Sequence, residues 1–112
     1  MLLPILPDTL RIPCGEAYPG LIAVVRPMDL EDKARWFDAT AGEVGSSLAA
    51  VEAVRRQLVT IEGLAVEAAD GTTVSFDATN HAHFRALPMA LITPIFTALI
   101  ERTALHEDHR KN

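Results

Sequence analysis

The pair Asp70-Gly71, placed between two β-prone runs, constrains the fold of this chain more than any other feature. The runs at 64–66 and 72–76 contain Val, Thr and Phe, and Asp-Gly between such runs is a strong signal for a β-hairpin. We therefore predict antiparallel strands on both sides of this turn. The side chains predicted to point inward are Val66, Val74 and Phe76.

A second pair of strands is predicted near the start of the chain. Residues 21–26 are rich in β-branched side chains, and Pro27 ends the run. Residues 9–12 alternate in polarity and form a shorter candidate strand. We expect the two to pair across a loop of about eight residues, which is longer than the usual two to five.

The first helix has a clear starting signal. Asp29 is a good N-cap, and Asp32 three positions later makes an acidic version of the capping box. The helix is predicted to end at Gly42, because glycine is the preferred residue just past a helix. The predicted apolar face consists of Leu30, Ala34 and Phe37, with Trp36 half-buried beside it.

A second helix is predicted after a joint at 42–47, with Ser46 or Ser47 as its cap and Gly63 as its end. Its apolar side chains follow helical spacing. These apolar positions are Leu48, Val51, Val54 or Arg55, Leu58 and Ile61. The solvated side is marked by Glu52, Arg55, Arg56 and Glu62.

Two further helices follow the hairpin. Asp77 is predicted to cap a third helix over residues 78–87, which Pro88 closes. The fourth helix begins either at Pro88, with a kink at Pro94, or at Pro94 with Thr93 as its N-cap, because proline suits the first helical position. The sequence leaves both alternatives open.

Together these elements predict an α+β fold with about four helices packed on a small antiparallel sheet or on hairpins. The chain has 112 residues, which fits a single domain spanning 1–112. Segments 1–8 and 106–112 are predicted to be flexible, because prolines interrupt the first and the second is polar.

Charge and cysteine content exclude several classes of protein. A net charge of −5, with basic residues scattered along the chain, is a poor match for a phosphate backbone, so we expect no nucleic-acid partner. The most apolar run, at 89–100, is too short to cross a bilayer. Since Cys14 is the single cysteine and no secretory signal is evident, we expect no internal disulfide and a cytoplasmic location.

Few side chains suggest catalysis or metal binding. His81 and His83 are two positions apart on a predicted helix and therefore point to different sides. His106 and His109 lie in the polar tail, so we predict no metal site and no cofactor. Cys14 could expose a thiolate in its turn, but no histidine is close in sequence. No residue is predicted to be catalytic, and a small metal- or thiol-dependent enzyme is the least favoured interpretation.

The last helix is the predicted partner-binding element. Its apolar face is wider than a surface helix needs, so it serves either as core or as a surface for recognising a partner. The six candidate binding residues are Leu91, Ile92, Ile95, Phe96, Leu99 and Ile100.

The order of segments resembles that of the small tail assembly chaperones of long-tailed phages and prophages. The similarity covers about residues 20–104 and lies in five segments. These are Val-Arg-Pro-Met-Asp-Leu at 25–30, Leu-Val-Thr-Ile-Glu-Gly-Leu at 58–64, Asp-Gly-Thr-Thr-Val-Ser-Phe-Asp at 70–77, Ala-Leu-Pro at 86–88 and Ile-Glu-Arg at 100–102. Ile61 stands where the family often has tryptophan.

The resemblance implies a non-enzymatic protein that coats the tape-measure protein, recruits tail-tube subunits and then leaves. It also implies self-association and a place in the cytoplasm of a bacterial host cell. Another structural phage protein, acting in tail completion or head–tail joining, is the main alternative. Neither the client nor the oligomeric state follows from the sequence.

Overall fold

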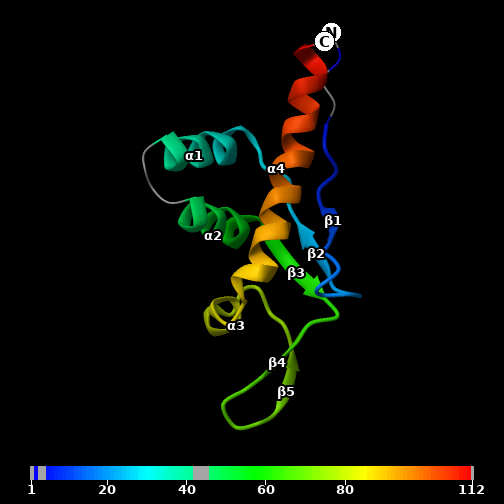
Figure 1. The fold of residues 1–112 in the computed structure, drawn as a ribbon, viewed down its shortest axis with the longest axis vertical. Helices are drawn as coiled ribbons and strands as arrows, with labels where there is room; N and C mark the ends of the chain where they lie inside the picture. Colours follow the sequence, from blue (N-terminus) through cyan, green and yellow to red (C-terminus); the bar gives the residue numbers. More distant parts are fainter. Residues whose placement is uncertain (1, 3–4, 42–45, 112) are drawn as a thin grey trace.

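The computed structural model describes the backbone of residues 2, 5–41 and 46–111, and the side chains of residues 2, 5–36 and 47–102. Within these ranges the chain forms helices and two small antiparallel sheets, so the predicted α+β class is confirmed. The molecule is elongated, with extents of 55 × 30 × 24 Å. Figure 1 shows a body of sheet and helices, with a hairpin extending from one end.

The main sheet has three antiparallel strands in the order β1-β2-β3. They are β1 (Leu10–Pro13), β2 (Ile22–Val25) and β3 (Leu58–Glu62). The predicted hairpin between the first two is confirmed, with Ile12 opposite Ala23. The backbone N–H of Cys14 donates to the Leu21 carbonyl at 3.0 Å and closes the loop end of this pair.

The third strand corrects the predicted second helix, which was expected to run on to Gly63. The helix α2 (Ser46–Gln57) stops before it, and the next five residues pair with β2 instead. A register irregularity at Val24/Val25 lets Leu58 and Ile61 both turn into the core, at 5% and 2% exposure. Side chains three apart in a regular strand face opposite sides, so this bulge produces an apolar spacing that imitates a helix.

Helix α1 (Leu30–Ala41) begins as predicted. Asp29 Oδ1 accepts from the Asp32 N–H at 2.8 Å, and Asp32 Oδ2 accepts from the Asp29 N–H at 3.1 Å. These reciprocal bonds are those of a capping box. The predicted apolar face is wrong, because Leu30 is 82% exposed and Ala34 is exposed; Phe37 lies outside the described side chains. Trp36 is half-buried, as predicted.

Helix α2 packs through small residues rather than through its leucine. Ala49, Ala50, Ala53 and Val54 are buried, whereas Leu48 is 61% exposed and was wrongly predicted to face inward. Small side chains let α2 approach its neighbours closely. Among the α2 side chains that the structure describes, the one buried polar residue is Gln57, at 4% exposure.

Helix α3 (His81–Arg85) is shorter than predicted. Its N-cap is Asn80, whose side-chain oxygen accepts from Ala82 N–H at 3.0 Å and His83 N–H at 3.3 Å, so the prediction of Asp77 as the cap was wrong. Asp77 instead accepts from the backbone N–H and the hydroxyl of Thr79, a local turn interaction. The turn delays the helix by several residues.

Helix α4 (Met89–Lys111) settles the two alternatives for its start. It begins just after Pro88, whose carbonyl accepts from Leu91 N–H at 2.9 Å, and Pro94 lies inside it. The alternative in which Thr93 is the N-cap is therefore wrong; its hydroxyl donates to the Met89 carbonyl at 3.0 Å. The backbone stays helical to Lys111, through most of the tail that was predicted to be flexible.

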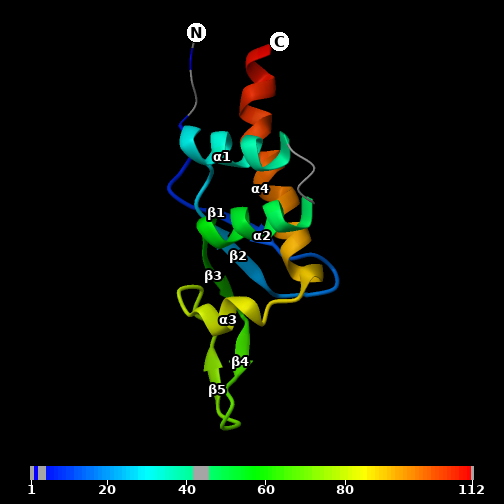
Figure 2. The ribbon, with the colours of Figure 1, turned by 90° about the vertical axis from the view of Figure 1, so that its left-hand side faces the viewer.

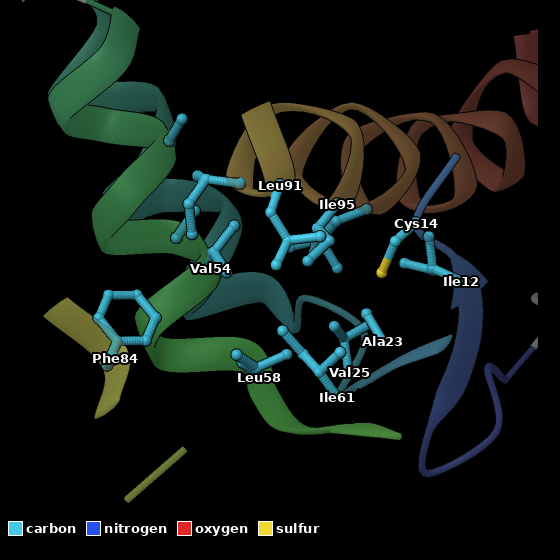
Figure 3. Packing of buried hydrophobic residues seen from close by; sticks show 14 of the residues in the cluster. Ile12, Cys14, Ala23, Val25, Val54, Leu58, Ile61, Phe84, Leu91 and Ile95 are labelled. Carbon is cyan, nitrogen blue, oxygen red and sulfur yellow. The ribbon is translucent and has the colours of Figure 1, made fainter. Parts of the chain in front are cut away.

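The core lies between α4, α2 and the inner face of the main sheet. Figure 3 shows Leu91 and Ile95 of α4 pointing toward Val25 and Ile61 of the sheet, with Val54 of α2 at one side. Burial of each such aliphatic side chain contributes about 1.5–3 kcal/mol. The core therefore joins three segments that are far apart in the sequence.

The second sheet is the predicted hairpin of β4 (Ala65–Glu67) and β5 (Thr73–Ser75). Both views place it beyond α3, at the end of the molecule away from the last turns of α4 (Figures 1 and 2). Phe76 is buried and Val66 half-buried, but Val74 is 42% exposed and does not point inward as predicted. Gly63, with φ +87°, leads into the hairpin where an added Cβ would lie 3.1 Å from the Gly20 carbonyl oxygen.

Candidate functional site

The six predicted binding residues of α4 are mostly core residues. Leu91, Ile92, Ile95 and Leu99 are at most 2% exposed. These four side chains pack inside the molecule and expose almost no surface. The sequence left open whether the apolar face of the last helix is core or a partner surface, and these four residues belong to the core.

The other two predicted residues lie at the edge of the core. Phe96 and Ile100 are half-buried and pack against the cluster of buried residues. The ring of Trp36, from α1, lies against Phe96 with the ring centroids 6.3 Å apart. Helix α1 thus covers part of the α4 surface that the sequence assigned to a partner.

A groove beside the start of α4 offers a more accessible surface. We name it the arginine groove, and it lies where α2, α3 and the first turns of α4 meet. Its volume is about 440 Å³. The residues that line it are Val51, Arg55, Phe84, Arg85, Leu87, Met89 and Ile92. The groove therefore includes only Ile92 of the six residues predicted from the sequence.

Local structure explains how the groove is built. Val54 and Arg55 are adjacent in α2 but face different ways. Val54 is fully buried in the core, and Arg55 is exposed at the groove. The Asn80 cap fixes the start of the short α3, so Phe84 turns inward, beside Val54 and Leu58 in Figure 3, while Arg85 stays exposed. Met89, at 45% exposure, forms an apolar part of the opening.

The charge of the groove differs from that of the whole chain. The Arg55 guanidinium lies 5.0 Å from the centre of the Phe84 ring, a distance typical of a cation–π contact. Neither Arg55 nor Arg85 makes an ion pair with any residue that the structure describes, and no acidic side chain is among the described residues that line the groove. In a chain of net charge −5, this is an apolar surface with two arginines that form no ion pair within the described residues.

The sequence predicted Arg55 to be on the solvated side of its helix and gave Arg85 no role. Arginine alternating with buried apolar residues is a weak signal, because most such arginines are simply solvated. Only the packing of α2 against α3 and α4 brings these two together beside the groove.

A second depression lies on the other side of α2, between α1 and α2. We name it the α1–α2 crevice; its volume is about 50 Å³. Gln57 Nε2 donates to Asp32 Oδ2 at 2.9 Å, and Arg35 Nη1 lies 3.9 Å from Asp32 Oδ1. Partial burial raises the pKa of the Asp32 carboxyl, but the Asp29 N–H, Gln57 and Arg35 outweigh it, so the pKa is below its ordinary value. These polar groups satisfy one another.

The reactive side chains that the structure describes have structural surroundings. Cys14 is 1% exposed within the core rather than in an open turn, and burial raises the pKa of its thiol. His83 Nδ1 accepts from the Asp77 N–H at 3.0 Å and its ring lies near Phe76, a structural role. No group of three or more metal-ligating side chains occurs among the described residues; His106 and His109 lie outside the described side chains.

Comparison with known proteins identifies no relative: no family model, no curated protein and no solved structure matches this chain. In the part of the chain that the structure describes, no helix has both the length and the apolar character needed to cross a membrane.

Proposed function

We propose that this protein is a non-enzymatic assembly chaperone of the phage tail type, which binds the tape-measure protein and recruits tail-tube subunits. The arginine groove is the observation that carries the protein-binding part of this proposal. It is an apolar depression with two exposed arginines at the surface of a small acidic domain. Such surfaces suit the recognition of an amphipathic polypeptide.

The phage tail part of the proposal comes from the order of segments. The Asp29–Asp32 capping box and the hairpin at Asp70-Gly71 are formed where the resemblance expects them. The segment Ile61-Glu62-Gly63 departs from the family pattern, because Ile61 and Glu62 end strand β3, whereas the family has a helix before this segment. The support for the family therefore lies in the entry to α1 and in the hairpin.

A chaperone of this kind must bind the apolar surface of its client without aggregating. A long helical client exposes apolar side chains before the tail is assembled, and an acidic domain that covers them keeps the complex in solution. Exposed apolar side chains elsewhere on the domain, such as Leu30 and Leu48, add surface for further subunits or for self-association.

Co-purification with the tape-measure protein encoded in the same genome tests the proposal. The two proteins, co-expressed with a tag on one, are expected to elute together from affinity and size-exclusion columns. Purified mature particles should lack the chaperone. Absence of a complex with folded protein, or the presence of this chain in mature particles, would contradict the proposal.

A further inference from the structure

We infer that the arginine groove binds a helical segment of a partner polypeptide in which one or two apolar side chains are flanked by Asp or Glu. This assignment rests on the proposed function in taking a polypeptide as the ligand, and it adds the binding surface and the chemistry of the bound segment.

The shape of the groove sets the size of what can enter. A volume of about 440 Å³ lies within the ~300–1,000 Å³ range of ligand sites. The groove lies open at the surface between helices, with buried Phe84 and Ile92 among the side chains that line it. An amphipathic helix can insert its apolar side chains into such a groove while its backbone stays outside.

The charge of the groove sets the chemistry of the flanking residues. Arg55 and Arg85 come from different helices, and both are exposed. By contrast, Arg11 bonds the Glu62 carboxylate through two nitrogens, at 2.8 and 2.5 Å, and Arg26 donates to the Arg56 carbonyl at 2.7 Å. A carboxylate from a partner would give the groove arginines the charge-assisted hydrogen bonds that they lack within the described structure.

The Phe84 ring helps Arg55 to recognise a carboxylate. The guanidinium 5.0 Å from the ring is held near the groove wall, so less side-chain entropy is lost on binding. Arg85 has no such contact among the described residues and is expected to contribute less. The two arginines should therefore differ in their effects.

A selection experiment identifies the preferred ligand without assuming its source. The full chain is used to enrich a yeast-displayed library of helical peptides with randomised solvent-side and groove-side positions. We expect enrichment of peptides with Leu, Ile, Met or Phe flanked by Asp or Glu. Enrichment of peptides with no preference for acidic residues, or no enrichment of any peptide, would overturn the assignment.

Charge reversal then locates the binding. The Arg55→Glu and Arg85→Glu substitutions together should weaken binding of the selected peptides, raising Kd by at least about tenfold, since charge-assisted hydrogen bonds are lost. The same variant should select Lys or Arg at the flanking positions. Arg102→Glu is the matched control, because Arg102 is also exposed but lies farther along α4; it should leave Kd unchanged. Equal binding by the groove variant and the wild type would overturn the assignment.

Folding is checked by circular dichroism before binding is measured. If the double reversal does not fold, the neutral pair Arg55→Gln and Arg85→Gln carries the same test, with a smaller loss expected. Amide chemical shifts of the wild type should change in α2, α3 and the start of α4 when a selected peptide is added. Changes confined to other surfaces would contradict the assignment.

A second copy of the chain is the competing occupant, because exposed Leu30 lies next to exposed Glu31. Sedimentation of the wild type, the groove variant and Leu30→Lys, each without added peptide, decides between a second copy and a separate partner. A dimer that dissociates on charge reversal at the groove and equally on Leu30→Lys would overturn the assignment in favour of self-association. A monomer, or a dimer unaffected by both changes, supports a separate partner.

The peptide site and the proposed phage-tail function can be disproved separately. If the tape-measure protein does not co-purify but acidic apolar peptides bind at the groove, the proposed function falls and the peptide site stands. If the tape-measure protein co-purifies equally well with the Arg55→Glu, Arg85→Glu variant, the function stands and the groove is not its binding site.

Discussion

The two depressions that lie on either side of α2 differ in how their polar groups are satisfied. In the α1–α2 crevice, Asp32, Gln57 and Arg35 interact with one another. In the arginine groove, Arg55 rests on Phe84 and neither it nor Arg85 meets a carboxylate among the described residues. The crevice is about 50 Å³ and the groove about 440 Å³.

This difference separates polar groups that hold the fold together from polar groups that are available to a partner. A buried amide paired with a carboxylate contributes to stability, and its loss leaves a desolvated group behind. Exposed arginines on an apolar surface contribute little to the fold. Substitutions of the hydrogen-bonded groups in the crevice should therefore change stability, whereas polar substitutions in the groove should change binding.

The largest expected effect tests whether the inner wall of the groove belongs to the core. Ile92 lines the groove but is only 2% exposed. Ile92→Ala should reduce the free energy of unfolding by about 2–5 kcal/mol, because it leaves a cavity. Urea denaturation measures the change. Leu48→Ala, on an exposed side chain of α2, is the control and should stay within about 0.5 kcal/mol; equal effects would remove the distinction between core and surface.

The next effect concerns the buried amide of the crevice. Gln57→Ala should reduce the free energy of unfolding by about 1–3 kcal/mol, because Asp32 loses a donor in a partly buried place. Glu52→Ala, in the same crevice but on an exposed side chain, is the control and should change stability by less than about 0.5 kcal/mol. If Gln57→Ala were no worse than Glu52→Ala, the crevice would be as tolerant as a surface.

A smaller effect appears in the pH dependence of stability. The folded pKa of Asp32 lies below its ordinary value of 3.8. Its contribution to stability is therefore fully present above pH 3.8 and is lost as the pH falls through the lower folded pKa. Asp32→Asn should destabilise the protein most near neutral pH, and the difference from the wild type should shrink in acid. Urea denaturation between pH 2 and 7 measures this.

Asp8→Asn is the control for the substitution, because Asp8 is an exposed residue that precedes β1. It should change the free energy of unfolding by less than about 0.5 kcal/mol. A difference between Asp32→Asn and the wild type that grows toward low pH would contradict the sign of the linkage.

The smallest effect is expected at the groove arginines themselves. Arg55→Met should reduce the free energy of unfolding by only about 0.5–1 kcal/mol, through the lost contact with Phe84. Arg85→Met should stay within about 0.5 kcal/mol. Thermal and urea denaturation of both variants measure this. A loss as large as that of Gln57→Ala would mean that the groove charges serve the fold rather than a partner.

Local signals in the sequence predicted several parts of the structure correctly. The capping box at Asp29 and Asp32 and the turn at Asp70-Gly71 form as expected, because their interactions join residues only two or three positions apart. The pairing of β1 with β2 was also correct. Exposed Leu30 and Leu48 were wrongly placed inward, because periodicity does not reveal which side of a helix meets its neighbours.

The candidate site was less accessible to prediction than the fold. The sequence shows the width of the apolar face on α4, but such a face serves a core or a partner equally well, depending on what packs against it. The arginine groove needs residues from α2, α3 and α4 at once, and no spacing in the sequence connects Arg55 with Arg85. Only tertiary packing brings these residues together.

By itself the sequence determined the turns, the caps and the α+β class, since these follow from backbone preferences and from hydrogen bonds between near neighbours. Only the tertiary structure decided that residues 58–62 form a strand, because their hydrogen-bonding partners lie on the distant β2 and the bulge there imitates helical spacing. It also decided that α4 fills the core, because an apolar face is buried or exposed according to what packs against it.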